Sequence, residues 1–92
     1  MKTELRETLR QYADRRVREI ATEHGVTLSE VRSLYTDQWW YTERWEGIQQ
    51  DAAVGKVIDR RALDSLEPMH RRHLAHDYPR SIPVGYVFPE AR

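Results

Sequence analysis

Residues 17–35 read VREIATEHGVTLSEVRSLY and contain the strongest folding signals in the chain. Gly25 follows a run of helix-forming residues, and glycine commonly ends a helix because it adopts a positive φ at low steric cost. Thr27 and Glu30 then have the spacing of a capping box, in which the hydroxyl and the carboxylate satisfy free backbone amides at the start of a second helix. The stretch therefore predicts two helices joined by a tight turn at Gly25.

The first of these helices is predicted to begin near the start of the chain. Residues 2–24 contain no glycine or proline, and Thr3 has a residue type that caps helices well. Apolar side chains recur at the spacing of one helix face. They are Leu5, Leu9, Tyr12, Ala13, Val17, Ile20 and Ala21. The pattern predicts one long amphipathic helix that ends at His24.

A third helix is predicted at about residues 38–52. Asp37 is a typical N-cap residue, and Trp45 and Ile48 after it have helical spacing. Gly55 marks a bend, because glycine weakens a helix and favours turns.

Residues 59–66 are predicted to form either a short helix or the end of the third helix, and a last helix follows them. Ser65 and Pro68 suit the start of that last helix, because proline is tolerated in a first helical turn. The helix is expected to end at about Asp77, since the residue before Pro79 is disfavoured in a helix.

The end of the chain, residues 79–92, predicts an extended C-terminal arm, because it holds three of the four prolines. Its large apolar residues alternate with others and are expected to project to one side and cover an apolar surface. They are Ile82, Val84, Tyr86 and Phe88. The expected fold is therefore all-α, with a small helical domain of about four helices at residues 1–78 and this arm after it.

The composition excludes several classes of function. Charged residues make up 33% of the chain but the formal net charge is zero, which argues against binding nucleic acid by bulk positive charge. There is no cysteine, so disulfides and thiolate metal sites are excluded, and we expect neither a metal nor a cofactor. No stretch is apolar enough to span a membrane, and the charge at Lys2 is unlike a secretory signal, so we expect a cytoplasmic protein.

Residues 17–35 resemble the helix-turn-helix unit of bacterial and phage transcription regulators, and are especially similar to that of TetR-type repressors. In such a unit two helices pack closely around a tight corner. The residues that carry the match are Ala21 where the helices cross, Gly25 at the turn, Val26 filling the corner, Thr27 as the cap, and Val31 and Leu34, which seat the second helix on the first.

The resemblance implies a recognition helix from Leu28 to Thr36 that enters the major groove of double-stranded DNA. Arg32 would read guanine or bind phosphate, and Thr27 and Ser29 would hold phosphates. The expected DNA-binding residues are Thr27, Ser29, Glu30, Arg32, Ser33 and Thr36. One short helix binds weakly, so a homodimer is expected. On this hypothesis the protein is a small DNA-binding regulator or a phage-type accessory factor.

The alternative hypothesis is a non-enzymatic protein that binds a host or partner protein through its aromatic helix and its arm. Tryptophan and tyrosine dominate the binding energy of such interfaces. The expected partner-binding residues are Trp39, Trp40, Trp45, Tyr86 and Phe88. We expect the arm to cover part of the aromatic helix. An exposed Trp39 or Trp40 favours this alternative, whereas a basic surface beside the second helix favours DNA; that surface would comprise Arg15, Arg16, Arg18 and Arg32.

Three histidines, His70, His73 and His76, recur every three residues with arginines between them. We expect a solvated basic face here, with contact to phosphate as an alternative. Metal binding is a lesser alternative because no cysteine supports it. Arg71 and His76 also have the arginine-to-histidine spacing of small helical ribonucleases of the HEPN type. That resemblance implies a residue that stabilises phosphate and one that moves a proton. It stays open as an alternative, and the expected protein is not an enzyme.

Overall fold

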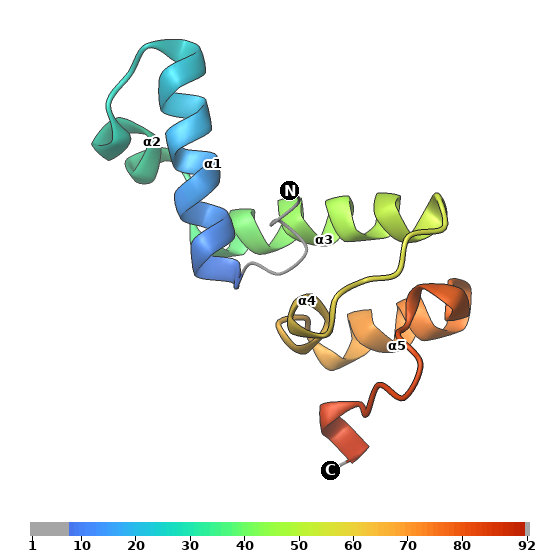
Figure 1. Cartoon of the computed structure of the whole chain (residues 1–92). Coiled ribbons are helices and arrows are strands. Elements are labelled where there is room, and N and C mark those ends of the chain that lie inside the picture. Colours follow the sequence, from blue (N-terminus) through green and yellow to red (C-terminus); the bar gives the residue numbers. More distant parts are fainter. Residues whose placement is uncertain (1–7, 92) are drawn as a thin grey trace.

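The computed structural model describes residues 8–91, and this part of the chain is built from α-helices and two short 3₁₀ turns (Figure 1). The elements are α1 (Leu9–His24), α2 (Leu28–Leu34), α3 (Asp37–Ala53), α4 (Arg60–Asp64), α5 (Pro68–Asp77), η1 (Pro79–Ser81) and η2 (Pro89–Ala91). The predicted all-α class is confirmed, with five α-helices in the described residues where about four were expected. None of these helices is both long and apolar enough to cross a membrane.

The corner between α1 and α2 forms as the local sequence predicts. Gly25 has φ 65° and ψ 35°, the left-handed conformation of a helix C-cap, and the N–H of Val26 donates to the carbonyl of Ala21 at 3.0 Å. Thr27 caps α2, and its hydroxyl accepts the Glu30 N–H at 3.1 Å. The Thr27 N–H donates in turn to the Glu30 carboxylate at 3.0 Å. The predicted capping box is thereby confirmed.

The start of α1 differs from the prediction. The expected cap Thr3 and the apolar residue Leu5 lie outside the described residues. The described helix begins at Leu9 and is capped by Thr8, whose hydroxyl accepts the Gln11 N–H at 3.1 Å. The Gln11 side chain accepts the Thr8 N–H at 2.9 Å, so a second capping box, Thr8-x-x-Gln11, marks the start.

The junction between α2 and α3 also corrects two predictions. Thr36, rather than Asp37, caps α3, because its extended backbone lets the hydroxyl accept the Trp39 N–H at 3.2 Å. Asp37 is instead the first residue of α3, where a negative charge is favourable near the helix N-terminus. The expected recognition helix ends at Leu34, and Tyr35 after it is already extended.

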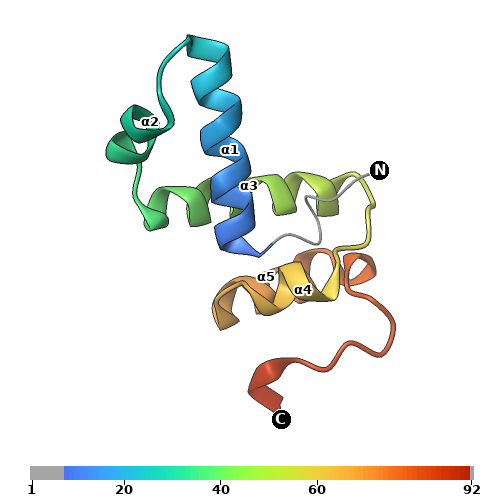
Figure 2. The ribbon, with the colours of Figure 1, turned by 60° about the vertical axis from the view of Figure 1, so that its left-hand side comes forward.

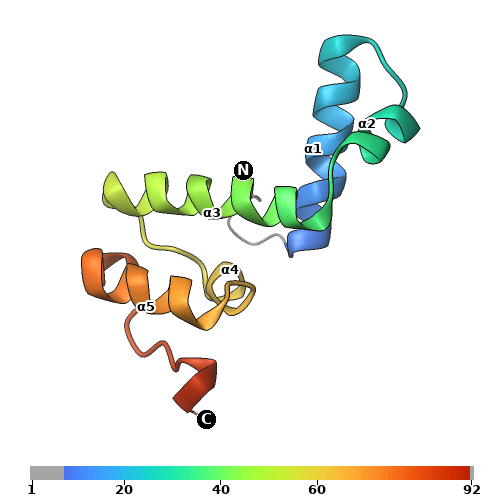
Figure 3. The ribbon, with the colours of Figure 1, turned by 180° about the vertical axis from the view of Figure 1, so that it is seen from behind.

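α3 is the element that joins the two halves of the molecule, as Figures 2 and 3 show from two sides. Its first half contributes Trp40 to one cluster of buried residues, with Val17 and Ala21 of α1 and Val31 of α2. Its second half contributes Ile48 and Ala52 to a separate cluster. The other buried members of that cluster are Ile58, Ala62, Leu63, Leu66 and Leu74. The molecule therefore has two small cores, and it measures 43 × 25 × 19 Å.

The segments around α4 and α5 agree with the predicted bend and short helix. Gly55 has φ 89° and ends the turn after α3. Asp59 caps α4, and its side chain accepts the Arg61 N–H at 2.9 Å. Ser65 terminates α4 and does not begin α5, whose first residue is Pro68.

The arm after α5 is irregular, and it packs back on the second core. Ile82 and Tyr86 lie against the buried cluster of α3, α4 and α5, and Phe88 contacts the Tyr86 ring with centroids 5.0 Å apart. The prediction that all four apolar residues face one side is wrong for Val84, which is 96% exposed. The reason is a turn at Gly85 (φ 79°), which breaks the alternation of an extended chain.

Candidate functional site

The residues that the resemblance assigns to DNA lie on one exposed surface around α2, but their polar groups serve the fold. The hydroxyl of Thr27 and the carboxylate of Glu30 form the capping box, and the Ser33 hydroxyl donates to the Glu30 carbonyl at 2.8 Å. Thr36 caps α3. Hydrogen bonds from Thr27, first from its backbone and then from its hydroxyl, lower the pKa of the Glu30 carboxyl, which favours its charged form. Ser29 is exposed beside them.

The arginines expected to form a basic surface beside α2 are largely engaged by carboxylates. Arg15 donates to Glu19 at 2.7 Å, and Arg16 donates to the same carboxylate at 2.7 Å. The hydrogen bond from Arg16 is the main reason that the pKa of the Glu19 carboxyl is lowered. Around α2 itself, Arg32 lies 3.9 Å from Asp14. Arg18 is exposed.

A three-residue polar contact holds α1 on α3. Glu43 of α3 accepts a hydrogen bond from the Tyr12 hydroxyl at 2.6 Å and another from Arg16 Nε at 2.6 Å. Burial raises the pKa of the Glu43 carboxyl, but the hydrogen bonds from Arg16 and Tyr12 outweigh it and the pKa lies below its usual value. Burial and the Glu43 hydrogen bond raise the pKa of Tyr12. These hydrogen bonds join α1 to α3, and we call the contact of Tyr12, Arg16 and Glu43 the Glu43 clamp.

The aromatic residues expected to bind a partner are spread over both cores. Trp40 is only 3% exposed and belongs to the first core, whereas Trp39 beside it is 49% exposed. Trp45 is half-buried and stacks on the His70 ring, with centroids 4.3 Å apart. Tyr86 and Phe88 lie with the arm on the second core. The arm packs against the second core, as Trp45 does, whereas it was expected around Trp39, Trp40 and Trp45, and Trp39 and Trp40 belong with the other core or are exposed.

Leu34 gives the largest correction to the predicted corner. It was expected to seat α2 on α1 together with Val31, yet Val31 is fully buried and Leu34 is 73% exposed. Leu34 is the last residue of α2, and the extended Tyr35 follows it. Val26, expected to fill the corner, is 38% exposed. A large apolar side chain therefore lies in solvent at the end of α2.

Leu34 lies close in the chain to a second exposed apolar residue, Trp39. Tyr35 follows Leu34, and the Tyr35 ring contacts the rings of both Trp39 and Trp40, with centroids 5.2 Å apart in each case. We call Leu34, Tyr35 and Trp39 the α2–α3 surface. It combines two aromatic rings with an aliphatic side chain, and Thr36 in its middle is exposed.

A groove of about 560 Å³ adjoins the α2–α3 surface, between the start of α1, the end of α2 and the start of α3. Its apolar lining residues all pack in or against the first core: Leu9, Ala13, Tyr35 and Trp40. Its charged lining residues are two cations and two anions: Arg10, Arg32, Asp14 and Asp37. The groove is therefore lined by both apolar and charged side chains, and its charges are balanced in number.

The three histidines of α5 have different surroundings. His70 lies between Tyr41 and Trp45. The Tyr41 hydroxyl accepts the Glu67 N–H at 2.7 Å and is hydrogen-bonded to His70 Nδ1 at 2.7 Å. His73 and His76 both contact Asp77, at 3.2 and 2.8 Å. The hydrogen bond from His76 lowers the pKa of Asp77. Within residues 8–91, no three side chains of histidine, cysteine, aspartate or glutamate are close enough together to hold a metal ion.

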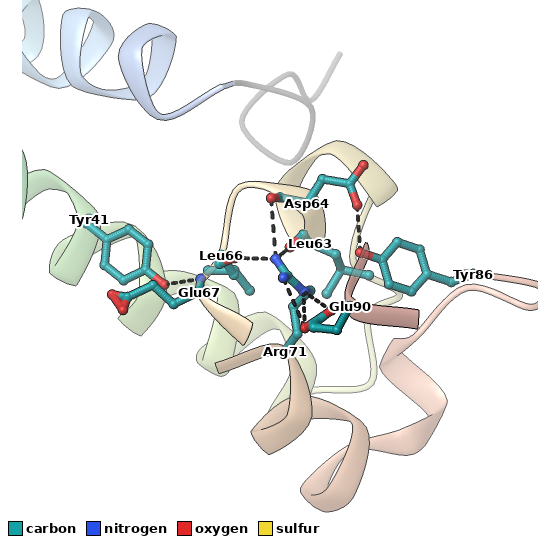
Figure 4. Close-up of polar contacts among 8 residues, drawn as sticks. All are labelled: Tyr41, Leu63, Asp64, Leu66, Glu67, Arg71, Tyr86 and Glu90. Carbon is teal, nitrogen blue, oxygen red and sulfur yellow. Dashed lines mark hydrogen bonds and ion pairs between the residues drawn. The ribbon is translucent and has the colours of Figure 1, made fainter. Parts of the chain in front are cut away.

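Arg71 is a buried arginine that fastens the end of the chain, as Figure 4 shows. It is 4% exposed and donates to the carbonyls of Leu63 and Leu66 at the end of α4. It also donates to the Glu90 carboxylate at 3.0 Å. His76 has a side chain that is 89% exposed and contacts Asp77, whereas Arg71 is engaged by Glu90. Nothing in the sequence pattern marks this arginine as buried.

The α2–α3 surface and its adjoining groove thus lie next to a corner in which Arg15 and Arg16 are paired with Glu19. The sequence analysis identified Trp39 as a candidate, but it expected Leu34 to be buried and did not predict the groove. One available signal for the end of α2 was Thr36, because threonine is a typical N-cap residue and indicates that α2 ends before it. Comparisons with family models, with curated proteins and with solved structures find no match.

Proposed function

We propose that this protein acts by binding another polypeptide chain through the α2–α3 surface, and that it is not an enzyme. The observation that carries the proposal is the exposure of Leu34, 73%, three residues after the fully buried Val31 of the same short helix. Burying a leucine side chain stabilises by roughly 1.5–3 kcal/mol, so a leucine left in water is available to drive association.

The neighbours of Leu34 support this function. Trp39 is half-exposed and its ring contacts Tyr35, so the surface combines the residue types that contribute most at protein interfaces. Trp39 lies in the first turn of α3, and Tyr35 packs against the buried Trp40. Rigid aromatic side chains lose little conformational entropy when a partner covers them.

Photo-cross-linking tests this proposal directly. A photoreactive amino acid replaces Leu34 in one variant and Val84 in a matched control, because Val84 is also apolar and highly exposed but lies in the arm after α5. The proposal predicts a discrete cross-linked product from position 34 in cells and none from position 84. Equal cross-linking from both positions, or none from position 34, contradicts it.

Double-stranded DNA is a second candidate partner, supported by one observation. The outward residues of α2, Ser29, Arg32 and Ser33, are exposed on a short helix that follows a tight, capped corner, as a recognition helix requires. The carboxylates that engage Arg15 and Arg16 place this candidate second. Fluorescence anisotropy with duplex DNA at low and high salt tests it: binding should weaken steeply with salt and weaken further in Arg32→Ala. Failure to bind duplex at low salt eliminates it.

A further inference from the structure

We infer that the polypeptide bound at the α2–α3 surface is a second copy of this chain, in a two-fold symmetric dimer; this inference rests on the proposed function. In such a dimer the same surface lies on both sides of the contact, so every group must find its complement within that surface. The charges around the groove and the apolar side chains next to it support such an arrangement.

The charges around the groove are self-complementary. Arg10 and Arg32 are matched by Asp14 and Asp37, and the formal net charge of the whole chain is zero. Within residues 8–91 the one ion pair among these four is the loose 3.9 Å contact of Arg32 with Asp14. Arg10 and Asp37 are exposed and take part in no ion pair there, so both are available to opposite charges across a two-fold axis. A nucleic acid or a strongly charged partner would favour one sign of charge instead.

The apolar features support the same arrangement. Each copy presents exposed apolar side chains, Leu34 and Trp39, and has a groove that adjoins them at Tyr35 and is lined in part by apolar residues. The groove volume of about 560 Å³ exceeds that of any single side chain. Tyr35 belongs to both features, because it lines the groove and contacts Trp39. Side chains from one copy therefore have a place to insert in the other, and the exchange is mutual.

The size of the protein also favours a second copy. The first core contains four buried residues, Val17, Ala21, Val31 and Trp40, which is a small core for α1, α2 and half of α3. A specific interface buries about 800 Å² on each partner. That is about one eighth of the 6399 Å² surface of this chain. A dimer at the groove would add apolar burial directly over this small core.

The test is a charge-mixing experiment on the full-length chain by sedimentation velocity. One variant, Asp14→Asn/Asp37→Asn, leaves only cations around the groove, and the other, Arg10→Gln/Arg32→Gln, leaves only anions. Each variant alone should be monomeric, whereas their equimolar mixture should form dimers, because only the mixture restores opposite charges across the interface. Unfolding caused by the substitutions would not be reversed by mixing, so a recovered dimer identifies the interface.

Wild-type and apolar variants complete the test. The wild-type chain should dimerise, and Leu34→Ser/Trp39→Ser should weaken the dimer by about tenfold or more, whereas Val57→Ser/Val84→Ser should not. A wild-type monomer at about 100 µM overturns the inference, since a specific interface of standard size persists well below that concentration. The cross-link at position 34 separates the two proposals: a product of twice 11.0 kDa supports a second copy. A product of another mass keeps the proposed function and rejects the dimer.

Discussion

Arg71 on α5 and Glu90 in the last turn of the chain form a two-pronged ion pair, with Nε to Oε1 at 3.2 Å and Nη2 to Oε2 at 3.0 Å. The remaining Arg71 nitrogen faces the carbonyls at the end of α4, including those of Leu63 and Leu66. One buried side chain thus connects α4, α5 and the arm. Hydrogen bonding by Arg71 is the main reason that the pKa of the Glu90 carboxyl is lowered.

Replacing Arg71 should therefore lower the free energy of unfolding more than replacing its partner Glu90. Arg71→Met leaves buried carbonyls without donors and should lower the free energy of unfolding by about 3 kcal/mol. Glu90→Gln keeps part of the hydrogen bonding at a half-exposed position and should cost about 1 kcal/mol. Chemical denaturation measures both. The matched control is Arg72→Met, an exposed neighbour, and equal losses at positions 71 and 72 would show that the buried network contributes nothing.

The Glu43 clamp predicts how stability depends on pH. The pKa of Glu43 in the folded protein is lowered from 4.5, so its stabilising contribution is complete at neutral pH and is lost as pH falls below about 4.5, through the folded pKa. Glu43→Gln should lower the melting temperature at about pH 7 and should flatten its decline between about pH 5 and pH 3. Thermal melts across this range check the prediction. Parallel acid curves for the variant and the wild-type chain would refute it.

Gly25 and Gly47 predict opposite effects of the same substitution. A Cβ at either position meets no atom within 4 Å, so only backbone conformation distinguishes them. Gly25→Ala forces a left-handed residue to carry a side chain and should destabilise by about 1 kcal/mol, and Gly25→Val by roughly 1–3 kcal/mol. Gly47→Ala lies inside α3 and should stabilise by up to about 1 kcal/mol. Equilibrium unfolding of the variants decides, and a destabilising Gly47→Ala would contradict the description of α3.

Single substitutions in the arm should separate its buried and exposed residues. Ile82→Ala removes a side chain packed on the second core and should cost about 1–2 kcal/mol. Val84→Ala changes a side chain that is 96% exposed and should alter stability by less than about 0.5 kcal/mol. Tyr86→Phe loses the 2.7 Å hydrogen bond to Asp64 and should cost about 1 kcal/mol. Equal effects at positions 82 and 84, measured by denaturation, would mean that the arm does not pack as described.

Deleting residues 79–92 tests the arm as a whole. The truncated chain loses Ile82 and Tyr86, which pack with Trp45 against the second core. Its melting temperature should fall by several degrees, since about 1 kcal/mol corresponds to roughly 4–8 °C in a domain of this size. Tryptophan emission should shift to the red as Trp45 becomes more hydrated. Unchanged stability and emission would show that the arm contributes nothing to the fold.

The sequence by itself determined the local features of the first half of the chain. Gly25, Thr27 and Glu30 specify the turn and the start of α2 through contacts between residues three or four positions apart. Such contacts depend on backbone geometry within one turn, so a single sequence suffices to predict them. The all-α class follows from the same signals, repeated at Asp59 and Pro68.

Only the tertiary structure decided which side chains remain in water. Val31 and Leu34 have the same helical spacing toward α1, and Trp39 and Trp40 are adjacent, yet one of each pair is buried and the other exposed. Burial depends on where a neighbouring helix ends and crosses, which is a property of packing between distant segments. For the same reason Arg71, one of many arginines in the sequence, became a buried anchor: α4, α5 and the arm meet around it.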